Sequence, residues 1–156
     1  MFNTDLYIDR IVPDVELARA FGRALGVRPD RVAVVPEDDL DAIEQAWKRV
    51  DVLLRTSRVR GEFPLAVDLM VRDLRRSQIL PMLERAAKSL HAAILTDEVG
   101  VNPLSDSEWL LIGPDGTATR VYADAEEFGA DDPAIILIGD SRRILHELQI
   151  EAPLAG

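Results

Sequence analysis

The strongest constraint on the fold is an alternation of side chains over residues 63–71. A period of two is the pattern of a β-strand with one face against a core, because successive side chains point to opposite faces. The residues before it alternate in the same way, and Gly61 stands between the two runs. We therefore predict a β-hairpin over residues 51–73. The apolar positions of this hairpin, with the residue just before it, are Val50, Val52, Leu54, Phe63, Leu65, Val67, Leu69 and Val71.

A second hairpin is predicted over residues 108–122, where two strand-like runs flank Gly113, Pro114, Asp115 and Gly116. Proline presets the second position of a type I turn, and glycine suits the fourth. Apolar residues at helical spacing predict three main helices over residues 15–25, 40–50 and 79–90. We predict a single α+β domain over residues 1–156, with a mixed or mostly antiparallel sheet packed on one side by these helices.

Charge divides the chain into two parts. Residues 1–90 carry 15 acidic and 15 basic side chains, whereas residues 91–156 carry 13 acidic and 3 basic ones, so the second part holds the whole net charge of −10. A negative field repels nucleic acids and attracts a basic protein partner. The alternative is that the acidic surface only keeps the protein soluble. The candidate partner-binding residues are Asp97, Glu98, Asp106, Glu108, Asp124, Glu126 and Glu127.

Composition excludes several classes of protein. The chain has no cysteine, which rules out disulfides, thiol catalysis and cysteine-bound zinc. No apolar run approaches the roughly 20 residues of a membrane-spanning helix. The start, MFNTDLYIDR, lacks the basic and apolar segments of a secretory signal. We therefore expect a cytoplasmic protein that does not engage a membrane.

No sequence motif of an enzyme is present. The zinc-protease, P-loop, nucleophile-elbow and dinucleotide-binding patterns are all missing, and His91 and His146 have no neighbour at metal-ligand spacing. We expect both histidines to be partly buried structural residues. The acids at 37–41 are more readily explained as caps of the helix that follows than as a metal site. We therefore predict no catalytic residues, no metal and no cofactor.

Two groups of arginines are candidate anion-binding sites. Arg55, Arg58 and Arg60 follow the outgoing arm of the first hairpin, and a second group lies at residues 72–76. Guanidinium groups bind phosphates and carboxylates. The alternative is a solvated face whose charges prevent strands from pairing edge to edge.

One part of the chain resembles a known family. An apolar helix leads into ILTDEVGVNPLSDSEWLLIGPDG at 94–116, and VYAD follows at 121–124. This succession of strand, acidic loop and hairpin, over about residues 80–125, resembles the C-terminal half of small bacterial immunity proteins of polymorphic toxin systems. The resemblance implies a protein that binds and covers a basic toxin rather than an enzyme.

Three functions follow, in order of preference. The first is a non-catalytic, acidic, protein-binding domain such as an immunity protein. The second is a self-associating structural or accessory protein, for example a homodimer joined at a strand edge. The third is a small-ligand binder or enzyme that uses an arginine patch.

Overall fold

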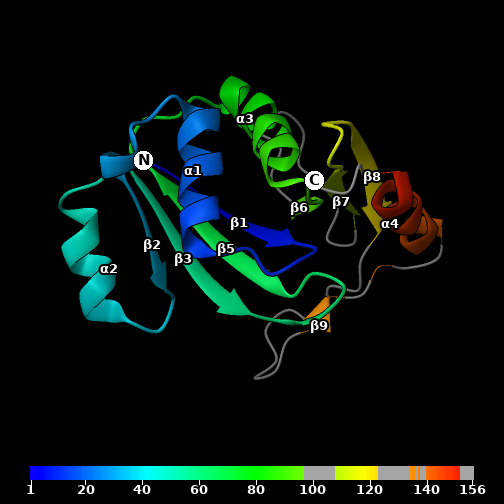
Figure 1. The fold of residues 1–156 in the computed structure, drawn as a ribbon, viewed down its shortest axis with the longest axis horizontal. Helices are drawn as coiled ribbons and strands as arrows, with labels where there is room; N and C mark the ends of the chain where they lie inside the picture. Colours follow the sequence, from blue (N-terminus) through cyan, green and yellow to red (C-terminus); the bar gives the residue numbers. More distant parts are fainter. Residues whose placement is uncertain (97–107, 123–133, 136, 138–139, 152–156) are drawn as a thin grey trace.

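The computed structural model describes residues 1–96, 108–122, 134–135, 137 and 140–151 (Figure 1). The elements follow one another as β1 (Phe2–Ile8), α1 (Asp14–Leu25), a 3₁₀ turn (Pro29–Arg31), β2 (Val32–Pro36), α2 (Leu40–Trp47), β3 (Val52–Arg58), β4 (Arg60–Gly61), β5 (Leu65–Val71), α3 (Arg76–Leu90), β6 (Ile94–Thr96), β7 (Glu108–Ile112), β8 (Ala118–Tyr122), β9 (Ala134–Ile135) and α4 (Asp140–Glu151). The predicted α+β class is confirmed.

Among the described residues, seven strands form one mixed sheet in the order β2-β3-β5-β1-β6-β7-β8, and β4 pairs with β9 separately. Of the neighbouring strands described in this large sheet, only β2 and β3 run parallel. Both predicted hairpins are confirmed, since β3 pairs antiparallel with β5 and β7 with β8. In the second hairpin, Gly116 N donates to Gly113 O at 2.9 Å, which closes the expected turn.

One face of the sheet, here called the helix-covered face, packs against α1 and α3 (Figure 1). The alternating residues of β5 that define the first hairpin point to this face, where Leu69 is fully buried. Leu6 of β1 and Leu54 of β3 also point to this face, because each is paired directly with an inward-pointing residue of β5. Phe21 of α1 and Leu83 of α3 pack into this core from the helix layer and are fully buried. This face therefore forms a continuous apolar layer.

The position of α2 corrects the prediction that all three main helices lie on one side. Ala46 of α2 packs with Leu53 of β3 and Met70 of β5, whose side chains alternate away from the helix-covered face. The reason lies in the strand order. The step from β1 to β2 crosses the sheet in one direction and the step from β2 to β3 returns in the other. Two right-handed crossovers in opposite directions place their helices on opposite faces.

The opposite face, here called the far face, is covered at its two ends by different helices. Near β2 it is covered by α2, and near β8 by α4, as the ends of the sheet in Figure 1 show. Leu145 of α4 is fully buried in a second core with Trp109 and Leu111 of β7. An ion pair between Arg142 Nε and Glu62 Oε1, 3.0 Å apart, also ties α4 to the segment after β4.

Local chemistry accounts for the helix ends. Gly26, directly after the predicted helix 15–25, takes the left-handed conformation with φ of 68° and ends α1. The acids before α2 act as expected, because Asp39 Oδ1 accepts a hydrogen bond from Ala42 N at 3.1 Å. His91 ends α3 with φ of 48°, a conformation that few non-glycine residues adopt.

Candidate functional site

Most of the predicted acidic partner-binding residues lie outside the described part of the chain. These are Asp97, Glu98, Asp106, Asp124, Glu126 and Glu127. Glu108 is described as the first residue of β7. The described strands fix the points at which the two acidic segments join the sheet, residues 97–107 after β6 and residues 123–133 after β8.

Those attachment points share one end of the sheet. In the antiparallel register Thr96 of β6 faces Leu110 of β7, and Glu108 of β7 faces Tyr122 of β8. The last residue of β6, the first of β7 and the last of β8 therefore lie at the same end of three neighbouring strands. Two acidic stretches that are separated by 15 residues in the sequence thus start from one place.

The three candidate anion-binding arginines are not brought together by the strands. Arg55 and Arg58 differ in parity along β3, so their side chains leave opposite faces of the sheet. Arg60 belongs to β4, which pairs with β9 rather than with the large sheet. Arg55 forms an ion pair with Asp68 of β5, its direct cross-strand neighbour on the far face.

The Arg55–Asp68 pair stands in a polar row across the middle of the far face, between the parts covered by α2 and α4. Asp5 of β1 faces Asp68 in register, so two carboxylates and one guanidinium follow one another across three strands. The side chains of Asp68 and Arg55 are 11% and 24% exposed. Asp68 Oδ1 and Arg55 Nε are buried without a hydrogen-bond partner among the described residues. Asp5 is exposed, so only the Arg55–Asp68 pair of this charged row is largely buried.

The second arginine group is used in part for structure. The guanidinium of Arg72 lies over the ring of Trp47, 3.9 Å from its centroid, and donates from Nε to Val50 O at 2.9 Å. It also donates to Trp47 O. Trp47 stands at helical spacing with Leu40 and Ile43, which predicts a core residue. Its side chain is only half-buried, because the arginine rather than another apolar side chain covers its ring.

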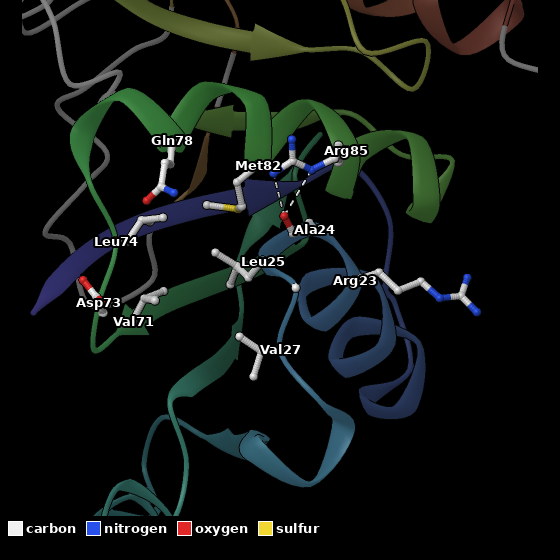
Figure 2. Close-up of a pocket in the computed structure, with 11 residues that line it drawn as sticks. Arg23, Ala24, Leu25, Val27, Val71, Asp73, Leu74, Gln78, Met82 and Arg85 are labelled. Carbon is white, nitrogen blue, oxygen red and sulfur yellow. Dashed lines mark hydrogen bonds between the residues drawn. The ribbon is translucent and has the colours of Figure 1, made fainter.

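A pocket of about 360 Å³ lies where the end of α1, the end of β5 and the first turns of α3 meet (Figure 2). Its apolar wall includes Leu25, Val27 and Leu74, which are half-buried, and its floor includes Val71 and Met82, which are buried. This volume is at the lower end of the range for small-ligand pockets.

Charged side chains stand on two sides of the pocket. Arg85 reaches across from α3, and its Nε and Nη2 donate to Ala24 O at 3.1 and 2.7 Å. Figure 2 shows Asp73 on the other side of the apolar wall, and Arg23 pointing away from the pocket. The pocket thus combines an apolar wall with one fixed guanidinium and one carboxylate at separate positions.

Asp9 connects α4 to the sheet. Its Oδ1 accepts from Ala93 N at 2.9 Å, and its Oδ2 accepts from Gln149 Nε2 at 3.0 Å. Burial raises the pKa of the Asp9 carboxyl, although both hydrogen bonds act in the opposite direction. The Asp9 carboxyl that binds Gln149 of α4 is therefore harder to ionise than an exposed aspartate.

Other titratable groups show no shared site among the residues that the structure describes. Both histidines are exposed, which corrects the expectation of partial burial, and His146 Nε2 lies 3.9 Å from Glu62 Oε1. The described residues contain no group of three or more His, Asp or Glu side chains arranged to hold a metal ion. Within the same residues, no helix has the length and apolar character needed to cross a membrane.

The sequence offers no signal for the pocket or the polar row. The pocket lining comes from segments near residues 25, 73 and 82, which are joined only by tertiary packing of α1 on α3. The polar row depends on strand register between β1, β3 and β5, of which only the β3–β5 hairpin is evident from local pattern. Asp68 stands out in the alternating run as a charge on its less buried side, but nothing local indicates its partner.

Comparisons of the chain with protein-family models, with curated proteins and with solved structures found no match.

Proposed function

We propose that this chain is a non-catalytic protein-binding domain whose acidic part, residues 91–156, receives a basic protein partner. The sequence resemblance to immunity proteins points to a toxin as the class of partner. The observation that carries the proposal is the shared starting point of the two acidic segments, at the ends of β6, β7 and β8. This shared starting point supports a local concentration of negative charge rather than an even distribution of charge over the chain.

Charge concentration matters because a field of one sign steers an oppositely charged partner and raises the association rate. Residues 1–90 are electrically neutral overall, and several of their charges are taken up in ion pairs such as Arg31 with Asp51 at 2.9 Å. A basic partner is therefore attracted to the part formed by residues 91–156 rather than to residues 1–90. This type of recognition requires complementary charge and shape, and no catalytic group.

The proposal is tested by capturing partners of the tagged chain from its native cell lysate at low salt. We expect a stoichiometric basic protein that is released as ionic strength rises, because salt screens exposed charges beyond a Debye length of about 10 Å at 0.1 M. Asp124→Asn with Glu126→Gln should weaken capture. The matched control, Glu37→Gln with Asp38→Asn, removes the same charge from exposed positions in the neutral part and should leave capture unchanged.

Two results would contradict the proposal. One is a partner that stays bound at molar salt. The other is equal weakening by the control pair, because net charge alone would then explain the binding.

A second candidate function, self-association, is favoured by the edge of β8. Among the described strands β8 pairs only with β7. Tyr122 N points outward and donates to Ser141 Oγ at 2.8 Å, and by antiparallel alternation Arg120 N points outward too. Arg120→Pro would remove this outward donor without breaking a ladder hydrogen bond to β7. A dimer seen by sedimentation that dissociates in this variant would support edge pairing, and a monomer at high concentration would rule it out.

A further inference from the structure

We propose that the pocket between α1, β5 and α3 binds a small carboxylate with a short branched apolar body. The pocket lining includes none of the acidic residues of the proposed partner surface, so its test does not depend on the proposed partner. The class of ligand follows from the chemistry of the lining, in which apolar side chains and a fixed guanidinium meet.

The apolar body would contact the half-buried side chains of the wall. Leu25, Val27 and Leu74 come from two separate segments and converge on the pocket, as Figure 2 shows. Each leaves part of its apolar surface in contact with water. A ligand that covers them removes this surface from water, and the hydrophobic effect then favours binding. Met82 at the floor has an unbranched, adaptable side chain that suits ligands of varying shape.

The carboxylate would meet Arg85. Two donors of this guanidinium are held by Ala24 O at 3.1 and 2.7 Å, which fixes the side chain against the end of α1. The remaining N–H groups of the planar fork are then oriented before any ligand arrives, which lowers the entropic cost of binding. A charge-assisted hydrogen bond from arginine to a carboxylate is stronger than one between neutral groups.

Asp73 sets the orientation of the ligand. Figure 2 places it across the apolar wall from Arg85, and it has no hydrogen bond or ion pair among the described residues. A carboxylate head at that side would be repelled, whereas the Arg85 side is attractive. The two rim charges therefore favour one direction of binding.

The test is a methyl NMR titration of the whole chain with 4-methylpentanoate at millimolar concentration. We expect shifts of the methyl groups of Leu25, Val27, Leu74 and Met82, while those of Leu145 in the second core stay in place. The uncharged isostere 4-methylpentanamide and the cation isoamylamine should bind more weakly. Equal shifts with the amide, stronger binding of the amine, or no shift with any probe would overturn the proposal.

Two variants and one control locate the interaction. Arg85→Gln should weaken binding about tenfold or more, as expected for loss of a charge-assisted hydrogen bond. Arg85→Gln also removes the donors to Ala24 O. A second variant, Leu74→Ser, therefore changes the apolar wall and leaves Arg85 in place. This variant should weaken binding too. Arg19→Gln removes an exposed charge from α1 outside this pocket and should leave binding unchanged. Unaltered binding in both pocket variants would overturn the assignment.

The carboxylate has two chemical sources that the same titration separates. N-acetylleucine presents a branched apolar carboxylate as the end of a peptide does. Tighter binding than 4-methylpentanoate would assign the pocket to a peptide C-terminus, and weaker binding would assign it to a free small acid. Either result requires the same contacts with Arg85 and Leu74.

Discussion

The two faces of the sheet are built from the same strands but differ in their packing and charge. The helix-covered face packs against α1 and α3 as one continuous apolar core. The far face holds two smaller cores, under α2 and α4, with the charged row of Asp5, Asp68 and Arg55 across the strands between them. Successive residues of β5 point to opposite faces of the sheet. The apolar core and the charged row are therefore built from alternate residues of the same strand.

The largest effect should come from truncating one of two adjacent residues of β5. Leu69→Ala leaves a cavity in the continuous core and should lower the free energy of unfolding by about 2–5 kcal/mol. Met70→Ala, its neighbour on the far face, should cost less, because the Met70 side chain is half-buried and removes less surface from water. Denaturant unfolding monitored by circular dichroism measures both. Equal losses would break the distinction between the faces.

A smaller effect is expected in the charged row. Arg55→Met leaves the Asp68 carboxylate partly buried without its ion-pair partner and should cost about 2 kcal/mol, less than the loss for a fully buried pair because Arg55 is 24% exposed. The double variant Arg55→Met with Asp68→Leu should be close to wild type in stability. An apolar pair at these positions leaves no charge whose removal from water costs free energy.

A double-mutant cycle based on denaturant unfolding gives the coupling between Arg55 and Asp68. Additive losses would show that the pair contributes nothing to stability.

The smallest effect should appear in the pH dependence of stability. Burial raises the folded-state pKa of Asp9 above the ordinary value of 3.8. The folded state therefore binds this proton more tightly than the unfolded state does. The contribution of Asp9 is largest below the unfolded pKa and is lost as pH rises through the raised folded pKa.

Asp9→Asn should remove that dependence and preserve the contact with Ala93 N. Thermal unfolding at a series of pH values measures the change, and hydrogen exchange in α4 reports whether the helix stays attached. The lowered pKa values of Asp51 and Asp115, caused mainly by hydrogen bonds from Arg31 and from Thr117 N, act in the opposite sense. Their contributions are lost as pH falls, in the variant as in the wild type. A variant with an unchanged pH profile would show that folding does not raise the pKa of Asp9.

Much of the secondary structure was predictable because its causes are local. The alternation at 65–71, the turn at 113–116 and Gly26 at the end of α1 each act through neighbours in the sequence. Phe63, predicted as part of the same alternation, lies before β5 and packs in the second core. Trp47 shows where local reasoning failed, because its half-buried ring is covered by Arg72, 25 residues away. The candidate site was predictable only as a charge imbalance. The arginines of the first hairpin were grouped by closeness in the sequence, and strand parity separates Arg55 from Arg58.

The sequence by itself determined the α+β class, the two hairpins and the division of charge at about residue 90, since periodicity, turn chemistry and composition are properties of neighbouring residues. Only the tertiary structure decided which helix covers which face, which residues line the pocket, and that both acidic segments leave one end of the sheet. These features depend on strand order and register, through which the handedness of crossovers and the parity of side chains act between residues far apart in the chain.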